Sequence, residues 1–204
     1  MTSSPEPAAS WKRPPPKSYE DLDESCVSTA LMNALRDAFK EKNFPVYVYG
    51  AVGVGKSYAA ALVYARFTAS RVVFTRFCDL MADCSNADIR GEVEMKPSAG
   101  DTCVLTSRAW WRWIEDIDLL VIDEVGTGSP NVYRQELFWK VLECRKRKPT
   151  LMTGNLNIDE IQSHFTARIS SRFSAGTLIE FVGKDRRADG AGDRSVIIKV
   201  KDSK

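Results

Sequence analysis

The stretch Gly50-Ala-Val-Gly-Val-Gly-Lys-Ser57 decides which fold this chain can adopt. Its spacing fits the pattern G-x-x-x-x-G-K-[ST], in which a glycine-rich loop joins a strand to a helix. The sequence predicts both neighbours, because residues 45–49 form an apolar run typical of a buried strand and residues 58–68 are alanine-rich and helical in pattern. A glycine-rich turn without a ligand is the competing interpretation, and the predicted strand and helix argue against it.

The residue types in this loop suit a triphosphate. Glycines let the backbone curl so that its N–H groups converge on phosphate oxygens, and the following helix adds the positive end of its dipole. Lys56 would place its ammonium group on the β- and γ-phosphates, and the Ser57 hydroxyl would coordinate Mg²⁺. We therefore predict that ATP and Mg²⁺ bind here. The predicted binding residues are Gly50, Ala51, Val52, Gly53, Val54, Gly55, Lys56, Ser57 and Tyr58.

An acidic pair follows the most apolar predicted strand. The run 119–122 is continuous and ends in Asp123 and Glu124, where Asp123 would hold Mg²⁺ and Glu124 would orient and polarise the attacking water. Two solvated carboxylates at an exposed strand end are the alternative. Asn155, after the strand predicted at 150–153, could contact both the γ-phosphate and the water, although asparagine is also common in turns.

Composition indicates one globular domain. The chain has 204 residues, of which 44% are hydrophobic, and its net charge of +2 gives no strong global field. Five scattered cysteines and a single histidine argue against a disulfide framework or a zinc site. Because no apolar run has the length of a membrane span and no signal peptide is visible, we expect a soluble cytoplasmic protein.

Alternating strand and helix patterns predict an α/β fold with a mainly parallel sheet. Residues 85–104 are expected to form an irregular polar connection, and 158–173 one helical apolar face. The Pro- and Ser-rich residues 1–18 predict a flexible arm, either a passive tail or a partner-binding segment. The five predicted strands are 45–49, 72–75, 119–122, 150–153 and 178–181, with a sixth possible at 196–200.

Three further clusters leave alternatives open. Arg168 and Arg172 lie four residues apart on one predicted helix, where they are either solvated or directed at the phosphates of a neighbouring subunit. Three tryptophans between residues 110 and 113 could stack on bases, but Trp110 and Trp113 also fit a buried helical face, which we favour. The basic run 145–148 could complement a helix dipole or contact DNA.

The order of these elements resembles AAA+ ATPases of the bacterial helicase-loader type, the DnaC/IstB family, which are relatives of the initiator DnaA. The similarity covers about residues 18–187. Phosphate loops and acidic pairs occur in many ATPases, whereas Arg168-Ile-Ser-Ser-Arg172 and Phe181-Val-Gly-Lys-Asp-Arg-Arg187 are more specific. Two departures are a short arm in place of a helicase-gripping N-terminal domain, and Gly154 where the family more often has serine.

This resemblance implies a P-loop NTPase core at 19–187, with a three-layer αβα sandwich, a five-stranded sheet, no separate lid domain and a C-terminal tail at 188–204. It also implies roles for single residues. Lys56 and Ser57 match the Walker A ligands, Asp123 and Glu124 the Walker B pair, and Asn155 sensor 1. Arg172 resembles an arginine finger acting in trans, Arg168 a second interface arginine, and Arg187 a sensor 2 candidate.

The function implied is ATP hydrolysis by a homo-oligomeric ring or spiral. Such a protein would bind single-stranded DNA and load or remodel a replicative helicase, in a bacterial cell or a phage-infected host, without a membrane. An ATP-dependent DNA-binding scaffold or transposition helper with little hydrolysis is the alternative. A small-molecule kinase fits less well, because Glu124 and the paired arginines point to hydrolysis by water.

Overall fold

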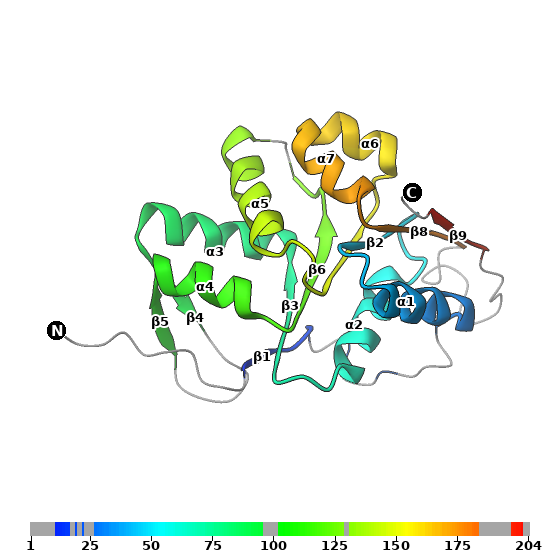
Figure 1. Cartoon of the computed structure of the whole chain (residues 1–204), viewed down its shortest axis with the longest axis horizontal. Coiled ribbons are helices and arrows are strands. Elements are labelled where there is room, and N and C mark those ends of the chain that lie inside the picture. The colour runs from blue at the N-terminus through cyan, green and yellow to red at the C-terminus, as the bar shows by residue number, and fades with distance from the viewer. Residues whose placement is uncertain are drawn as a thin grey trace.

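The computed structural model describes residues 11–16, 19, 22, 27–95, 102–128, 131–183 and 197–201. A seven-stranded sheet in the order β1-β3-β6-β7-β2-β8-β9 forms the middle of the molecule (Figure 1). Its five central strands are mutually parallel and correspond to the five predicted strands, which confirms the α/β fold with a mainly parallel sheet. These strands are β2 (Val46–Tyr49), β3 (Arg71–Arg76), β6 (Leu119–Val125), β7 (Thr150–Gly154) and β8 (Thr177–Val182).

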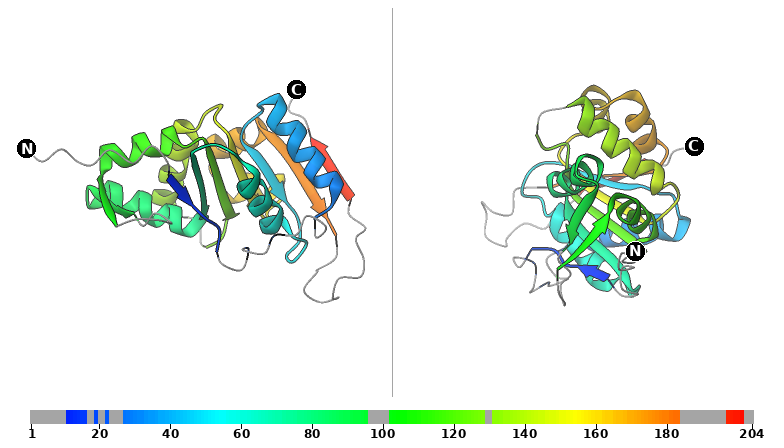
Figure 2. Two further views of the ribbon diagram at one scale, coloured as in Figure 1. Left: turned by 90° about the horizontal axis from the view of Figure 1, so that it is seen from below. Right: turned by 90° about the vertical axis from the view of Figure 1, so that its left-hand side faces the viewer.

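Helices cover both faces of this sheet, giving three layers (Figure 2). The first group packs on one face and contains α1 (Thr29–Glu41) and α2 (Lys56–Arg66). The second group forms the other hydrophobic core and contains α3 (Phe77–Ile89), α4 (Ser107–Asp116), α5 (Val132–Cys144), α6 (Ile158–His164) and α7 (Ala167–Ser174).

The strands separate these two cores because successive side chains point to opposite faces. In β2, Val46 and Val48 belong to the core under α1 and α2, whereas Tyr47 and Tyr49 belong to the core under the second group of helices. All four residues are buried, as expected for a central strand of a parallel sheet.

Two edge strands extend the predicted five. β1 (Trp11–Arg13) pairs in parallel with β3, and β9 (Ile197–Lys201) pairs antiparallel with β8. The sixth strand predicted near the C-terminus is therefore present. The expectation of a flexible arm over 1–18 did not foresee β1, since three residues lack the periodicity that identifies a strand and their pairing comes from the exposed edge of β3. Arg13 adds an ion pair with Asp83 of α3 at 3.0 Å.

The connection over 85–104 is more ordered than its sequence predicts. Helix α3 continues to Ile89, and β4 (Glu92–Met95) and β5 (Cys103–Thr106) form a separate antiparallel pair. Figure 1 shows this pair with α3 and α4 at the end of the molecule away from α1. Every second residue of β4 is buried, and this alternation is too short to be recognised among the surrounding polar residues.

The single helical face predicted over 158–173 is divided into α6 and α7. Phe165 ends α6 in an extended conformation, and the backbone N–H of Thr166 donates to the Gln135 side chain at 2.8 Å. This tertiary bond satisfies the N–H that a continuous helix would have bonded internally. Asn157 followed three residues later by Glu160 also predicts a capping box, and this box is present at the start of α6.

The sequence also predicts a helix that starts at Ser129-Pro130. These two residues, most of the arm and tail, and Arg187 lie outside the described residues. The domain limits at residues 18 and 187 remain predictions. Among the described helices, none combines the length and the apolar character that crossing a membrane requires.

Candidate nucleotide-binding site

The loop between β2 and α2 has the backbone geometry of a phosphate cradle. Gly50, Gly53 and Gly55 have positive φ angles of 152°, 81° and 103°, which L side chains rarely adopt. At Gly50 a Cβ atom would also lie 2.1 Å from the carbonyl oxygen of Phe181 on β8. The glycines are therefore required by the curl of the loop and by its close approach to the neighbouring strand.

Lys56 is the first residue of α2, and its side chain returns over the loop. Its Nζ donates to the carbonyl oxygens of Gly50 at 2.9 Å and Ala51 at 2.6 Å, and the residue is only 7% exposed. A buried ammonium that bonds neutral carbonyl oxygens gains more from an anionic partner such as a phosphate. The cradle and this cation together fit the phosphates of a nucleotide.

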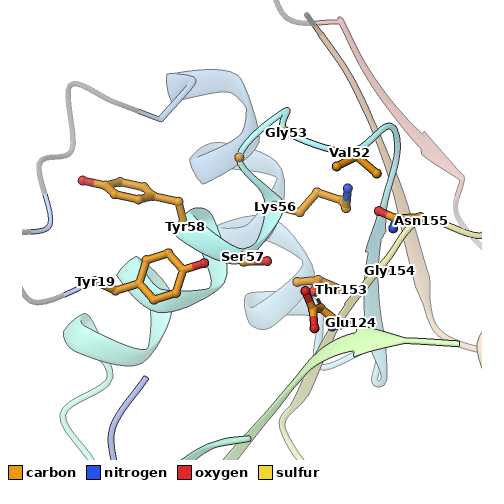
Figure 3. Close-up of a pocket in the computed structure, with 11 residues that line it drawn as sticks. Tyr19, Val52, Gly53, Lys56, Ser57, Tyr58, Glu124, Thr153, Gly154 and Asn155 are labelled. Atoms are coloured by element: carbon orange, nitrogen blue, oxygen red, sulfur yellow. Dashed lines mark hydrogen bonds between the residues drawn. The ribbon is translucent and has the colours of Figure 1, made fainter. Parts of the chain in front are cut away.

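A cavity of about 320 Å³ opens beside the loop at the carboxyl ends of the parallel strands (Figure 3). This is the edge at which open α/β sheets generally bind ligands. The sequence predicted eight of its lining residues, namely Val52, Gly53, Gly55, Lys56, Ser57, Tyr58, Glu124 and Asn155. The lining residues that it missed are Tyr19, Thr153 and Gly154.

The acidic pair lies in a β-bulge. The register between β6 and β7 shifts after Ile122, so that Asp123 and Glu124 together oppose the single residue Thr153. Glu124 has a positive φ of 61°, which is uncommon outside glycine. The bulge keeps Asp123 buried while Glu124 is exposed at the cavity, and this separates the two carboxylates that the sequence placed side by side.

Thr153 holds this bulge. Its hydroxyl donates to Oδ1 of Asp123 and accepts the backbone N–H of Glu124 at 3.2 Å. Nothing in the local sequence marks Thr153 as functional. The usable signal is its place in the predicted sheet, since it ends the strand that pairs with the acidic pair.

Ser57 and Asp123 meet as the prediction of a magnesium site requires. The Ser57 hydroxyl donates to Oδ1 of Asp123 at 2.8 Å, and Asp123 is 5% exposed. Mg²⁺ prefers oxygen ligands and usually binds proteins through one or two side chains, with water and substrate phosphates completing its octahedron. A hydroxyl and a carboxylate beside a phosphate cradle fit that ion.

Two tyrosines form an aromatic wall of the cavity. The rings of Tyr19 and Tyr58 are 6.2 Å apart and meet edge to face, and Tyr19 also lies 6.4 Å from Phe74 on β3. Aromatic faces suit the stacking of a nucleobase. Tyr19 could not be predicted, because one aromatic residue just beyond a Pro-rich segment has no periodicity to interpret.

The two candidate interface arginines do not line this cavity. On α7, Arg168 pairs with Glu136 at 2.5 Å, and Arg172 Nε donates to Glu143 at 2.6 Å. Both guanidinium carbons lie 5.3 Å from the ring centroid of Trp139, which belongs to α5. Within the chain, both arginines are therefore engaged with α5 rather than with the nucleotide site.

Arg172 lines a different cavity, of about 490 Å³. Its walls include the residues that precede β2, the turn before β7 and Ala175 before β8, so this cavity lies at the end of the strands opposite the phosphate loop. The lining residues carry no carboxylate. The cationic ones are Lys42, Arg145, Lys146, Arg147 and Arg172.

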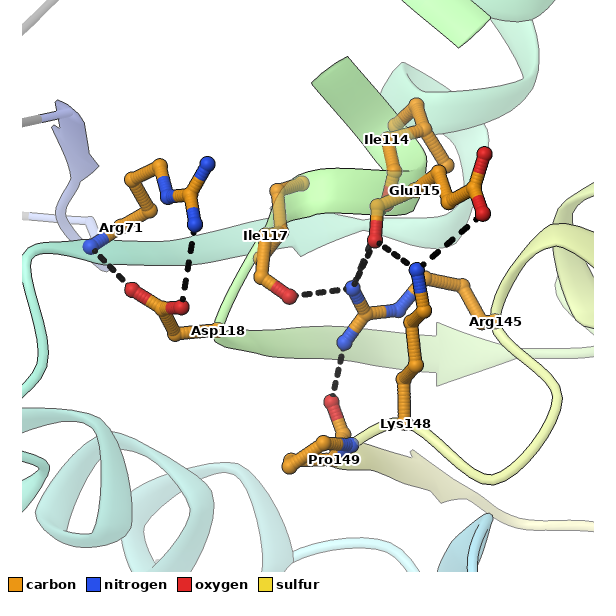
Figure 4. Close-up of polar contacts among 8 residues, drawn as sticks. All are labelled: Arg71, Ile114, Glu115, Ile117, Asp118, Arg145, Lys148 and Pro149. Carbon is orange, nitrogen blue, oxygen red and sulfur yellow. Dashed lines mark hydrogen bonds and ion pairs between the residues drawn. The ribbon is translucent and has the colours of Figure 1, made fainter. Parts of the chain in front are cut away.

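Arg145 belongs to this basic run but has a structural role (Figure 4). It is 3% exposed, and its guanidinium donates to the carbonyl oxygens of Ile114, Ile117 and Pro149. Burial lowers the pKa of Arg145 to about 10, so the group stays charged at neutral pH. Lys148 likewise bonds Glu115, which leaves Lys146 and Arg147 as the exposed cations of the run.

The tryptophans follow the buried-face interpretation. Trp110 and Trp113 are 1% and 2% exposed, with ring centroids 5.0 Å apart. Trp111 is half-buried, and the ammonium group of Lys140 lies 4.0 Å from its ring centroid. The rings of Trp110 and Trp113 therefore belong to the hydrophobic core and are not available to stack on nucleobases.

Comparison with solved structures identifies the fold. DnaA from Aquifex aeolicus, bound to AMPPCP, is 18% identical over 82% of this chain and 54% of that chain, with a TM-score of 0.60. DnaI is 20% identical over 86% of this chain and 99% of that chain, with a TM-score of 0.60. The DnaC helicase loader is 17% identical over 79% of this chain and 97% of that chain, with a TM-score of 0.57.

No family model matches the sequence, and no curated protein matches it. At identities near one fifth, these likenesses establish the fold: the chain has the P-loop fold of the AAA+ ATPase domains of initiators and helicase loaders. The predicted resemblance is thus confirmed at the level of the fold. This chain spans about half the length of the DnaA chain that it matches.

Proposed function

We propose that this protein binds ATP with Mg²⁺ and hydrolyses it. One observation carries the proposal: glycines of the phosphate cradle, Lys56, Ser57 and Glu124 line one cavity, and Ser57 is bonded to Asp123. Lys56 would exchange its carbonyl partners for phosphate oxygens. Ser57 and Asp123 would hold Mg²⁺, which when bound neutralises phosphate charge.

Glu124 is the residue proposed to activate water. It is exposed at the cavity, and its φ of 61° indicates a backbone held in an unfavourable conformation, as occurs where surrounding structure fixes a functional side chain. Its carboxylate would accept a proton from the attacking water, while Asn155 on the adjacent strand end would orient that water. Tyr19 and Tyr58 would flank the base.

A nucleotide switch that binds ATP and barely hydrolyses it is the second candidate. It is favoured by the engagement of Arg172 with Glu143, because no arginine then lines the cavity among the residues that the structure describes. Glu124→Gln distinguishes the two candidates. A hydrolase should lose at least about 100-fold in kcat, the scale of general-base catalysis, while it retains ATP binding. A switch should show the same negligible turnover before and after the substitution.

Arg172 is proposed to act on the nucleotide of a neighbouring copy. Its cavity lies at the opposite end of the strands from the phosphate loop and is rich in cations, with Lys146 and Arg147 at its exposed side. An arginine supplied in this way neutralises charge that develops during phosphoryl transfer. Arg168 would be a second contact of the same interface.

Mixed assemblies test this arrangement. Arg172→Ala and Lys56→Ala should each be inactive alone, and their equimolar mixture should recover part of the wild-type kcat, because an intact phosphate loop then meets an intact arginine. Lys140→Ala, on the adjacent helix, is the control and should be as active as the wild type without mixing. Full activity of Arg172→Ala by itself would refute the assignment.

The role proposed for this ATPase is in DNA replication, as an oligomer that loads or remodels a replicative helicase. Its support is the fold shared with the DnaC helicase loader and DnaI, and with a DnaA bound to AMPPCP and single-stranded DNA. Purified wild-type protein should bind fluorescent single-stranded oligonucleotides more tightly with ATP than with ADP. Capture with Glu124→Gln protein and ATP should retain a replicative helicase; a transposase in its place would favour the transposition helper.

A further inference from the structure

Tyr47 connects the strand before the phosphate loop to the loop that carries Asn155. It lies in β2, is 0% exposed, and its hydroxyl donates to the carbonyl oxygen of Leu156 at 2.8 Å. Burial raises the pKa of this hydroxyl, so it remains a protonated donor at all physiological pH values. Deprotonation of Tyr47 therefore does not interrupt the bond in this pH range.

The ring of Tyr47 is fixed on two sides. It stacks on Tyr49 with centroids 5.7 Å apart, and it meets Phe173 of α7 edge to face at 4.8 Å. Phe173 directly follows Arg172. A ring packed in this way presents its hydroxyl at a defined point, because rotation would displace both neighbours.

Gly154 provides the space through which the hydroxyl reaches its acceptor. A Cβ atom at this position would lie 2.4 Å from the Tyr47 oxygen and 2.8 Å from the carbonyl oxygen of Val125. Any other residue would have to displace the hydroxyl or the Val125 backbone. Gly154 and Tyr47 are therefore complementary, which gives a physical reason for glycine where serine is more common in the resembled family.

Leu156 is held from a second direction. A Cβ atom at Gly126, which follows the acidic pair and has a φ of 89°, would lie 2.5 Å from Cδ1 of Leu156. The Leu156 side chain thus packs directly on the backbone beyond Glu124, while its carbonyl is bonded to Tyr47. Asn155 stands between two residues that are both fixed by these contacts.

We propose that Tyr47 is a positioning residue for hydrolysis: its hydroxyl, passing over Gly154 to the Leu156 carbonyl, holds the backbone so that Asn155 faces the phosphate cavity. This inference rests on the proposed role of Asn155. Tyr47 itself does not line the cavity and touches no reacting atom. Its loss should therefore lower kcat without changing the affinity for ATP.

The first test is Tyr47→Phe, which removes only the hydroxyl. We expect kcat to fall about tenfold, while the Kd for a fluorescent ATP analogue changes less than about twofold. Tyr49→Phe is the matched control, because the Tyr49 ring lies on the same face of the same strand. The bond to Leu156 comes from the Tyr47 hydroxyl, so this variant should keep it. A wild-type kcat for Tyr47→Phe, with a reduced kcat for Asn155→Ala, would overturn the inference.

A double-mutant cycle tests the contact with Gly154. Gly154→Ala places a methyl group against the Tyr47 hydroxyl, so the fold-loss in kcat that it causes should be smaller in Tyr47→Phe protein than in wild type. The Val125 carbonyl oxygen still clashes with the methyl group in the double variant, so Tyr47→Phe should restore only part of the kcat that Gly154→Ala loses. Equal losses in both backgrounds would contradict the proposed complementarity.

Hydrogen exchange separates this inference from the proposed function. Amides in peptides that span residues 153–158 should exchange about tenfold faster in Tyr47→Phe and at the wild-type rate in Tyr49→Phe, whether or not ATP is hydrolysed. If Asn155→Ala leaves kcat unchanged, the role of Asn155 fails, while faster exchange still supports the anchor. Unchanged exchange in Tyr47→Phe would refute the anchor itself.

Discussion

Thr153 lies directly across the sheet from the bulge that contains Glu124, and its hydroxyl accepts the Glu124 backbone N–H at 3.2 Å. The same hydroxyl donates to Asp123. One side chain on β7 therefore fixes both residues of the acidic pair on β6, one through its carboxylate and the other through its backbone. This relationship suggests that the geometry of the pair depends on β7 as much as on its own strand.

Thr153→Val should lower kcat about tenfold and the free energy of unfolding by about 1–2 kcal/mol. Valine keeps the shape of threonine but leaves the Glu124 N–H and the Asp123 carboxylate without their buried partner. Steady-state hydrolysis and urea unfolding measure the two effects. Thr153→Ser keeps the hydroxyl and should retain most of the activity; if the serine variant is as impaired as the valine variant, the hydroxyl is not the relevant group.

Lys56→Ala should abolish the stabilisation of the protein by MgATP. For the wild type, ATP at 100 times its Kd should add about 2.7 kcal/mol to the free energy of unfolding, because it binds only the folded state. Thermal unfolding with and without nucleotide measures this difference. Lys40→Ala, an exposed lysine in the last turn of α1, should keep the full shift. An undiminished shift in Lys56→Ala would place the phosphates elsewhere.

Glu143→Gln should lower the protein concentration at which ATPase activity is half-maximal, by up to about fivefold. Glu143 holds Arg172 within the chain, and a half-exposed pair of this kind contributes at most about 1 kcal/mol. Releasing Arg172 favours its contact with a neighbouring copy. Activity measured over a dilution series gives the midpoint, with Glu115→Gln, which instead removes the ion pair of Glu115 with Lys148, as the control. A higher midpoint for Glu143→Gln would mean that the pair is part of the interface.

Arg145→Met should lower the free energy of unfolding by about 3 kcal/mol. The variant protein that remains folded should bind DNA with the affinity of the wild type. The guanidinium satisfies buried carbonyl oxygens at the end of α4 and in the turn before β7, and methionine offers them no donor. Urea unfolding measures the loss. Lys146→Met, at the next and exposed position, should change stability by less than about 0.5 kcal/mol. Similar stabilities for both variants would refute the structural role of Arg145.

Much of the fold could be predicted because its strongest signals are local. Five apolar runs of the right length predicted the five parallel strands, and helical periodicity predicted the buried face of Trp110 and Trp113. Short elements were missed, since β1 and the β4–β5 pair depend on a neighbouring edge or on a few alternating residues. The division between α6 and α7 was missed because the Gln135 side chain that satisfies Thr166 lies on another helix.

The phosphate loop and the acidic pair could both be identified from the order of the amino acids alone. Glycines, a lysine and a serine at fixed spacing act through their own backbone and their own helix, so that local order is sufficient. Their surroundings depend on how the chain folds: Thr153 lies at the bulge, Tyr19 at the cavity wall, and Tyr47 is bonded to Leu156 across 109 residues of sequence. Such contacts depend on the order and register of the strands, which bring distant residues together and leave no periodic trace along the chain.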